Sequence, residues 1–310
     1  MEGRGEEALL SILILSWNTR ELTLRCLEAL ERDPFEGGRE ILLLDNGSGD
    51  GSADAVEARF PEVRLRRSST NLGYAVGNNR LADEARGEIL CLLNSDTEVR
   101  PGALLTCVDF LRRHPEYAGC APRLVSPDGS VQRSCKRFPG LSTVLTYDMF
   151  WAGWPLIRRI EDRYFMRDFD HLHDRDVLQP PGACFLVRRE VWERLGGLDP
   201  ELWLYYNDVD FCLRLHQEGG RIRYLAGPEV LHHEGASTRV FASMLETWAR
   251  NRIAFHRKHH GAFGERLVRF MLRLRAWQEW WRIGRRHRDR RSRRDARAEL
   301  RRILHEVLAG

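Results

Sequence analysis

Short apolar runs that end in polar residues recur along the first third of the chain. Between them, apolar side chains at helical spacing predict helices over residues 18–32, 53–59 and 74–86, the first capped by Thr19. This alternation predicts an α/β fold with a Rossmann-like, mostly parallel sheet flanked by helices. The runs read as strands are residues 9–17 (LLSILILSW), 40–45 (EILLLD), 63–68 (VRLRRS) and 88–96 (EILCLLNSD).

The pattern becomes mostly helical towards the end of the chain. Residues 136–178 show no regular period, so we expect a long irregular insert there, near the functional face. Residues 240–305 are mostly helical, which divides the chain into an α/β domain over residues 1–240 and a helical, Arg-rich extension over 241–310. The elements expected in between are a helix over 101–114, a hairpin turn at 127–129, a strand and a helix over 182–197, and a helix over 208–219.

Charge separates the same two regions. The 310 residues are 43% hydrophobic, which is enough for a substantial core. Residues 266–310 contain 15 Arg against 5 Asp and Glu, a net charge of +10, which leaves about −6 for the rest of a chain whose total is +4. No run approaches the roughly 18 apolar residues of a membrane-spanning helix. The seven scattered Cys form no CxxC pair, and Cys91, Cys184 and Cys212 lie in apolar segments and read as core residues in a reducing compartment.

Two of the predicted strands end in acidic residues. Asp45 follows one strand, and Asn94 and Asp96 follow another. Parallel sheets bind ligands outside the carboxyl ends of their strands, so these side chains are expected in a cleft. Asp45 either forms a turn after its strand or accepts hydrogen bonds from a nucleotide. Asp96 either caps a helix or holds a hard divalent cation such as Mg²⁺ or Mn²⁺.

Three further segments contain residues suited to chemistry. The first, residues 70–79 (TNLGYAVGNN), places Gly at a strand-to-helix turn, where backbone amides favour phosphate. Asp208 and Asp210 stand two residues apart at a helix start and therefore point in different directions. One of them is suited to act as a general base towards an alcohol. In the segment LHHEGAST (231–238), His232 and His233 are either structural or metal ligands.

Taken in order, these segments resemble the family-2 glycosyltransferases, over about residues 10–238. The resemblance is closest to the rhamnosyltransferase-like branch that assembles cell-surface polysaccharides, and residues 182–215 (GACFLVRREVWERLGGLDPELWLYYNDVDFCLRL) are its most specific part. It implies a GT-A fold over residues 1–240, a nucleotide-diphosphate sugar donor, a divalent metal and inversion of the anomeric centre. The branch favours dTDP-rhamnose as donor, although no motif names the sugar or the base.

The resemblance also implies roles for individual residues. Asp208 would be the general base, and Asp96 with His232 would hold Mg²⁺ or Mn²⁺ and the diphosphate. Gly182 and Ala183 would line the sugar and acceptor cleft. The remaining residues of the nucleotide site would be Asp45, Asn71, Gly73, Asn79 and Asn94.

Two departures from the family pattern stand out. Asn207 occupies the position where the family usually has Glu, which removes one negative charge beside Asp208. The doubled histidine leaves the choice between His232 and His233 to alignment, and we favour His232. A catalytically degenerate nucleotide-sugar-binding module and a sugar nucleotidyltransferase remain as alternatives. The second would need a basic, Gly-rich phosphate loop, which the segment SWNTRELT does not supply.

The Arg-rich extension contains Trp277, Trp280 and Trp281 among its basic residues. Either its helices lie on an anionic membrane that presents a lipid-linked acceptor, or they pack their aromatic side on the rest of the protein. Nucleic acid is the least favoured partner, because the preceding region shows no basic pattern. We therefore expect a cytoplasmic enzyme, with peripheral contact at the inner face of the membrane left open. The partners expected are a nucleotide-diphosphate sugar donor and a glycan or lipid-linked acceptor.

Overall fold

The computed structural model describes residues 9–146, 149–233, 241–286 and 289–309. The chain divides into two compact units. The first comprises residues 1–137, 169–203 and 207–239, and the second comprises residues 138–168, 204–206 and 240–310. The division of the chain at residue 240 therefore needs a refinement, because the second unit also takes two earlier segments.

The first unit is built on one sheet with the strand order β3-β2-β1-β4-β8-β6-β9-β5, in which β7 pairs with β9. Its first part is parallel and comprises β1 (Leu10–Ser16), β2 (Arg39–Asp45), β3 (Arg64–Arg67) and β4 (Ile89–Asn94). The strands β1, β2 and β4 are nearly continuous apolar runs because helices cover both faces of a parallel sheet, whereas β3 (RLRR) is an edge strand and is partly exposed. The buried strands predicted from the sequence are therefore confirmed.

The rest of the sheet is mixed. The strands β5 (Thr97–Val99) and β7 (Arg175–Asp176) both run antiparallel to β9 (Ile222–His232), while β6 (Gly119–Val125) is parallel to β9. The strand β8 (Cys184–Arg188) runs antiparallel to β4 and β6. The sheet is thus less parallel than the alternation of strands and helices predicted, because β8 enters the sheet in the opposite direction.

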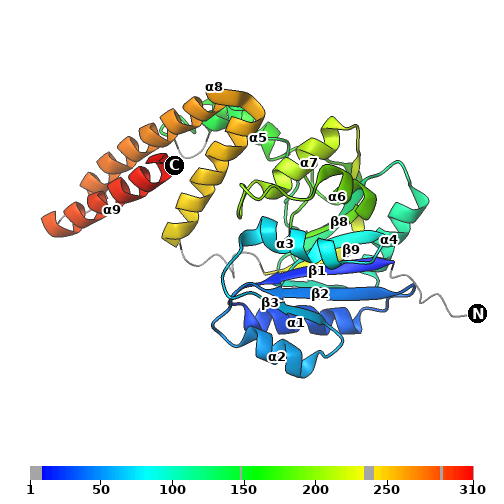
Figure 1. Ribbon diagram of the computed structural model, residues 1–310. Helices are drawn as coiled ribbons and strands as arrows, with labels where there is room; N and C mark the ends of the chain where they lie inside the picture. Colours follow the sequence, from blue (N-terminus) through cyan, green and yellow to red (C-terminus); the bar gives the residue numbers. More distant parts are fainter. Residues whose placement is uncertain (1–8, 147–148, 234–240, 287–288, 310) are drawn as a thin grey trace, which may run out of the picture. The chain divides into compact units, whose positions relative to one another are not determined.

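Helices pack on both faces of this sheet. In Figure 1, α1 (Arg20–Arg32) and α2 (Ser52–Arg59) lie together below β1 to β3, and α3 (Gly73–Glu84) lies above them. The other helices of the unit are α4 (Ala103–Arg113), α6 (Arg189–Leu195) and α7 (Asn207–Gln217). The core between the layers is mostly aliphatic. All seven cysteines are buried and free, including Cys91, Cys184 and Cys212, which were expected in the core.

The second unit is helical. It contains the 3₁₀ helix η1 (Leu141–Leu145), α5 (Pro155–Tyr164), α8 (Phe241–Arg286) and α9 (Arg290–Ala309). The prediction that residues 136–178 are irregular is therefore wrong, because η1, α5 and β7 lie within them. Gly261 has φ 63° inside α8, and this left-handed residue kinks the helix into two halves. Among the described residues, no helix has the length and apolar character to cross a membrane.

An apolar cluster and a polar clamp hold this second unit together. Val144, Val268 and Val307 belong to its cluster of buried side chains, which joins η1, α8 and α9. The Asn251 Oδ1 atom of α8 accepts hydrogen bonds from the backbone nitrogens of Leu204 (3.2 Å) and Tyr205 (3.0 Å). The three-residue segment 204–206 is thereby fixed to α8, because one side-chain oxygen satisfies two of its amides.

Candidate active site

Asp45 stands at the carboxyl end of β2, and its side chain is almost fully buried. Its Oδ2 atom accepts a hydrogen bond from the backbone nitrogen of Ser48 at 3.1 Å, so the predicted turn is present. Its Oδ1 atom is also buried but has no hydrogen-bond partner in the described part of the chain. A buried oxygen without a partner is costly, so this atom is available to a donor group of a ligand.

The loop after Asp45 is tied to the segment before α3. The Asn46 side chain donates to Asn71 Oδ1 at 2.9 Å, and its own oxygen accepts from the backbone nitrogen of Leu72 at 2.8 Å. A Cβ atom on Gly47 would lie 2.9 Å from the backbone of Thr70, so the two loops approach too closely for a side chain. Asp45 and Asn71 are thus brought to one edge of the sheet.

The first amides of α3 are already used within the protein. The backbone nitrogen of Gly73 donates to Asn71 Oδ1 at 2.9 Å, and that of Tyr74 donates to the Trp203 carbonyl at 2.7 Å. Gly73 has φ 81°, and a Cβ there would lie 2.4 Å from the Trp203 ring. Glycine is therefore required at this position by close packing, and these two amides are not free to bind phosphate as the Gly-rich turn suggested.

Asn79 is engaged in a similar internal contact. Its Nδ2 donates to the Leu198 carbonyl at 2.8 Å, and its Oδ1 accepts from the Leu198 nitrogen at 2.9 Å. Both ends of the amide thus fasten α3 to the segment after α6. Any role of Asn79 towards a nucleotide would therefore be indirect, through the position of α3.

Asp96 lies in the turn between β4 and β5 and is 3% exposed. Buried hydroxyl groups support this turn, because Ser95 Oγ lies 3.1 Å from Thr19 Oγ1. Thr19 precedes α1 as expected, but its side chain makes this contact and caps no amide of the helix. The neighbouring Asn94 pairs through its backbone nitrogen with the Ala183 carbonyl at 2.9 Å.

His232 reaches Asp96 from the end of β9. Its Nε2 atom lies 3.5 Å from Asp96 Oδ1 because Thr97 and His232 are paired in the sheet. Its Nδ1 atom lies 2.9 Å from Gln132 Oε1, and Gln132 Nε2 donates to the His232 carbonyl at 3.0 Å. These two bonds fix the ring and turn Nε2 towards Asp96.

The second histidine of the pair points elsewhere. His233 Nε2 lies 2.8 Å from Glu98 Oε1, whereas the His233 backbone nitrogen donates to the Asp96 carbonyl. The geometry therefore favours His232 as the partner of Asp96, in line with the choice made from the sequence. Residues 234–238 of the same motif lie outside the described residues.

The pair formed by Asp96 and His232 suits a hard or borderline divalent cation. No group of three or more His, Cys, Asp or Glu side chains within the described ranges is arranged to hold a metal by itself. A carboxylate oxygen and an imidazole nitrogen at 3.5 Å would supply two ligands, and a bound diphosphate and water would supply the others. The donor set thus fits a cation that arrives with a phosphorylated ligand.

Asp208 lies in the first turn of α7 and faces the segment that leads into β8. A Cβ on Gly182 would lie 3.0 Å from Asp208 Oδ2, so glycine leaves room for the carboxylate. Gln179 Nε2 approaches the same oxygen at 3.4 Å, and Asp208 Oδ1 accepts from the Val209 nitrogen at 2.8 Å. These contacts orient the carboxylate from two sides.

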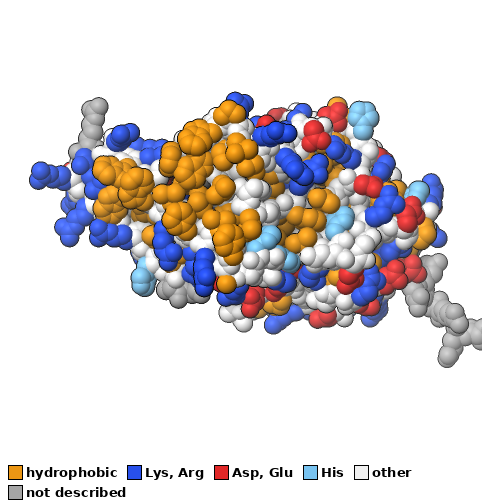
Figure 2. All heavy atoms as spheres, turned by 90° about the horizontal axis from the view of Figure 1, so that it is seen from above, with side chains coloured by type: hydrophobic (Ala, Val, Ile, Leu, Met, Phe, Trp, Pro, Cys, Tyr) orange, Lys and Arg blue, Asp and Glu red, His pale blue; other side chains and the backbone are white. Residues whose placement is uncertain are grey.

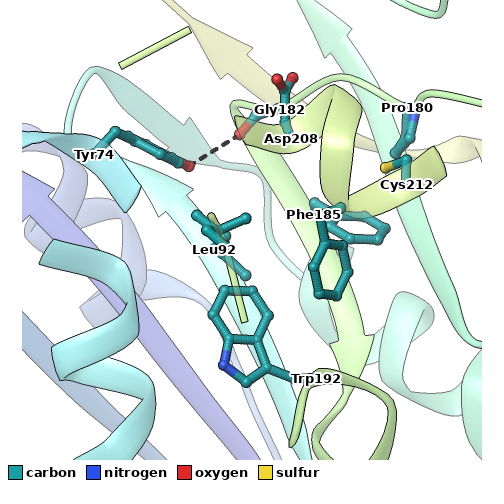
Figure 3. Close-up of a pocket in the computed structure, with 10 residues that line it drawn as sticks. Tyr74, Leu92, Pro180, Gly182, Phe185, Trp192, Asp208 and Cys212 are labelled. Atoms are coloured by element: carbon teal, nitrogen blue, oxygen red, sulfur yellow. Dashed lines mark hydrogen bonds between the residues drawn. The ribbon is translucent and has the colours of Figure 1, made fainter. Parts of the chain in front are cut away.

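An apolar pocket lies below this carboxylate. Figure 3 shows that Asp208 points away from the rings and aliphatic side chains, and that the Tyr74 hydroxyl group approaches the Gly182 carbonyl at 3.5 Å. Burial, and next the negative charge of Asp208, raise the pKa of Tyr74, so its hydroxyl group keeps its proton at neutral pH. The pocket is lined by Tyr74, Leu92, Pro180, Gly182, Phe185, Trp192, Leu198, Asp208, Phe211 and Cys212.

The neighbouring polar residues of α7 have structural roles. Asp210 is fully buried, and its Oδ2 lies 2.8 Å from Arg214 Nε, while the same guanidinium donates to the carbonyls of Leu195 and Gly197. Asn207 is also buried and donates to the Leu202 carbonyl at 3.2 Å. Asp208 and Asp210 thus point in different directions, as their spacing predicted, and Asp208 alone faces Gly182.

Sequence reasoning missed three residues of this site. Gln132 orients His232, Gln179 contacts Asp208, and Tyr74 approaches the Gly182 carbonyl in the pocket that Asp208 also lines. Tyr74 belongs to the segment TNLGYAVGNN, in which only the Gly and Asn residues suggested a ligand site. The two glutamines stand in segments with no pattern that marks them.

Comparison with known proteins gives one matching family and several relatives. The model of glycosyl transferase family 2 matches residues 11–196. The chain is 31% identical over 245 residues to the N-acetylglucosaminyl-diphospho-decaprenol L-rhamnosyltransferase of Mycobacterium tuberculosis, across 75% of this chain and 79% of that protein. It is 22% identical over 254 residues to the low-salt glycan biosynthesis hexosyltransferase of Haloferax volcanii, across 77% of this chain and 72% of that one.

Solved structures share the fold at low sequence identity. A mannosyltransferase from Pyrobaculum calidifontis in complex with GDP-Man and Mn²⁺ has a TM-score of 0.54 and 15% identity, over 98% of this chain and 86% of that chain. GalNAc-T7 with UDP, GalNAc and Mn²⁺ has a TM-score of 0.55 and 17% identity, over 79% of this chain and 48% of that chain. At this level of identity the likeness concerns the fold alone.

Proposed function

Because the chain belongs to glycosyltransferase family 2, we propose that it transfers a sugar, with inversion, from a nucleotide-diphosphate donor to a hydroxyl group of a lipid-linked acceptor. Membership rests on the family model over residues 11–196 and on the rhamnosyltransferase that is 31% identical. The GT-A fold, the rhamnosyltransferase-like branch and the glycosyltransferase class expected from the sequence are thereby confirmed. The donor, the metal and the roles of individual residues are proposals.

The positions of Asp96 and Asp208 support the proposal beyond family membership. The two residues Gly182 and Ala183 lie between the elements that hold the two carboxylates. Ala183 pairs with Asn94, two residues before Asp96, while Gly182 lies against Asp208. A metal ligand and a base on the two sides of one short segment are the minimum set for attack on a sugar diphosphate.

In the proposed reaction, Asp208 removes the proton from the acceptor hydroxyl group. The hydroxyl oxygen forms a bond with the anomeric carbon while the bond from that carbon to the diphosphate oxygen breaks. The proton passes to the Asp208 carboxylate, and the electron pair leaves with the nucleoside diphosphate. Gln179 and Gly182 keep the carboxylate in position, and the apolar pocket beneath it keeps water from that side.

The donor would bind along the edge formed by β2 and β4. The Asp45 Oδ1 atom, which lacks a partner among the described residues, would accept a hydrogen bond from the base or the ribose. Asp96 and His232 would hold a divalent cation that, when bound, neutralises the charge developing on the leaving diphosphate. Asn71 would act by fixing the loop after Asp45, to which it is hydrogen-bonded through Asn46.

The activity of the mycobacterial relative suggests the class of substrates. The mycobacterial protein is named as an L-rhamnosyltransferase acting on N-acetylglucosaminyl-diphospho-decaprenol. We propose an acceptor of the same chemical class, a sugar linked through diphosphate to a polyprenol, and dTDP-rhamnose as donor. Such an acceptor belongs to cell-surface polysaccharide synthesis at the cytoplasmic side of a membrane.

Donor binding and transfer can be tested separately. The wild type, Asp96→Asn, Asp208→Asn and the control Asp128→Asn are compared with UDP-, GDP- and dTDP-sugars, with and without Mn²⁺. Asp128 is suitable as a control because it is exposed in the turn after β6. We expect Asp208→Asn to keep the metal-dependent thermal shift with one donor but to lose about 10²- to 10⁴-fold in kcat.

Asp96→Asn should lose the metal-dependent shift itself, while Asp128→Asn behaves as the wild type. Full turnover by Asp208→Asn would remove it as the base. Donor binding without any hydrolysis or transfer by the wild type would instead favour the catalytically degenerate module. Family membership argues against a sugar nucleotidyltransferase.

A further inference from the structure

A line of exposed aromatic side chains runs along the second half of α8. Phe263, Phe270, Trp277 and Trp281 are 66%, 58%, 56% and 58% exposed. They follow one another at intervals of seven, seven and four residues, which keeps them within about 40° of one another around a helix of 3.6 residues per turn. The line is about 27 Å long at 1.5 Å per residue.

This line is not the face that packs inside the unit. Val268 and Met271 are buried in the cluster that η1, α8 and α9 share, on another side of the same helix. The helix after Gly261 therefore has two apolar sides, one of which is used for packing. A helix face that is exposed only to water normally has polar residues, but positions 263, 270, 277 and 281 are all aromatic.

Three more exposed apolar residues extend the surface. Phe150, Trp154 and Leu156 are 61%, 61% and 68% exposed, and they belong to the same unit. The Phe150 backbone nitrogen donates to Gln278 Oε1 at 2.8 Å, which fixes this segment to α8 at the residue that follows Trp277. These residues and the four of α8 are called the aromatic face below. Figure 2 shows hydrophobic side chains gathered into a broad area on this part of the molecule.

Basic side chains surround the aromatic face. Residues 262–286 contain seven Arg and two Glu, and Arg266 and Arg273 are exposed beside the line on the same helix. Further along α8, the guanidinium groups of Arg297 and Arg301 from α9 lie over the Trp280 ring, with their Cζ atoms 4.3 Å and 4.6 Å from the ring centroid. Figure 2 shows Lys and Arg at the border of the hydrophobic area. The border is therefore complementary to a negatively charged partner.

We propose that the aromatic face binds the surface of a bilayer that contains anionic lipid, with its Phe and Trp rings at the level of the headgroups. Trp and Phe favour the boundary between acyl chains and water, while Arg side chains reach the lipid phosphates. Each basic residue near an anionic surface adds to the attraction. A second copy of the chain is disfavoured as the partner, because two such basic borders would repel each other.

Membrane binding would bring the enzyme to its acceptor, because a polyprenol-linked acceptor resides in the bilayer; this purpose rests on the proposed function. The binding itself requires neither donor nor acceptor. A vesicle assay without substrates therefore tests the surface, and transfer to an acceptor dissolved in detergent tests the enzyme. Failure of one leaves the other standing.

The experiment measures sedimentation of the full chain with vesicles of phosphatidylcholine alone and of phosphatidylcholine mixed with phosphatidylglycerol. The variants are the double replacement Trp277→Ser and Trp281→Ser, and the control Leu172→Ser, which removes an exposed apolar side chain from the first unit. Thermal unfolding of each variant verifies that it is folded. Quenching of Trp fluorescence by brominated lipid reports whether the rings enter the bilayer.

We expect the wild type and Leu172→Ser to bind the mixed vesicles, with weaker binding to phosphatidylcholine alone and at higher salt. The folded double variant should bind at least about tenfold more weakly. Equal binding of the double variant, or no binding of the wild type, would overturn the proposal. A concentration-dependent dimer that the double variant abolishes, without lipid binding, would assign the face to a second copy of the chain instead.

Discussion

Replacing Gly182 by alanine adds one methyl group beside the proposed base. The new Cβ would lie 3.0 Å from Asp208 Oδ2, whereas ordinary contact begins at 3.4 Å. The backbone of Gly182 does not have a positive φ, so alanine is tolerated by the main chain. The strain therefore falls on the carboxylate, which must move by about 0.4 Å to restore an ordinary contact.

The size of the effect follows from this displacement. A misplacement of about 1 Å can reduce a rate by about 100-fold, so 0.4 Å corresponds to about 1 kcal/mol of activation free energy. We expect kcat to fall by about fivefold. The KM for the donor should stay unchanged, because neither Asp45 nor Asp96 contacts Gly182 in the structure.

Steady-state transfer at varied donor concentration measures kcat and the donor KM, and urea unfolding verifies that each variant is folded. The control is Gly227→Ala, because a Cβ at Gly227 would meet no atom within 4 Å and the residue has no positive φ. An unchanged kcat in Gly182→Ala would show that the Asp208 carboxylate does not act from the position seen here. A kcat loss matched in Gly227→Ala would refute the explanation by local contact.

Two further predictions concern His232 and His256. Gln132→Leu removes the hydrogen-bond acceptor that orients the His232 ring. The Mn²⁺ affinity in the presence of the nucleoside diphosphate, measured by calorimetry, should therefore fall about 10- to 100-fold. An unchanged affinity would exclude His232 as a ligand held by Gln132. Burial lowers the pKa of His256 from 6.5 to about 3. Between these values the unfolded chain binds a proton that the native protein does not, so stability falls as the pH drops below about 6.5, by at most about 1.4 kcal/mol per pH unit. His256→Leu should reduce this loss between neutral pH and about pH 5 in urea unfolding, and an identical loss in both proteins would contradict it.

The parallel part of the fold could be predicted because its strands are buried on both faces. Residues 10–16, 39–45 and 89–94 are apolar runs for that reason, and their ends marked Asp45 and Asp96 correctly as residues of one sheet edge. In contrast, β9 escaped notice because Gly227 and Pro228 interrupt it. A strand with these residues has a bulge opposite β6, which no period of two reveals.

The helix α5 was missed for a different reason. Ile157, Ile160 and Tyr164 stand at helical spacing, but the charged residues between them made the segment look irregular. The contact between Gln132 and His232 was beyond sequence reasoning altogether. It joins residues 100 positions apart and depends on where the chain after β6 meets the end of β9. The family resemblance already favoured Asp208 over Asp210, and the structure adds a physical reason, because Asp210 is buried and paired with Arg214.

The way the chain passes between its two units has a consequence for protein engineering. Residues 138–168 and 204–206 belong to the C-terminal unit, so the chain leaves the first unit and returns to it twice before residue 240. Chimeras that exchange the C-terminal helices between related enzymes at residue 240 would separate Asn251 from Leu204 and Tyr205. Successful swaps must carry all three segments together. The C-terminal helices alone are therefore not a segment that can be exchanged independently.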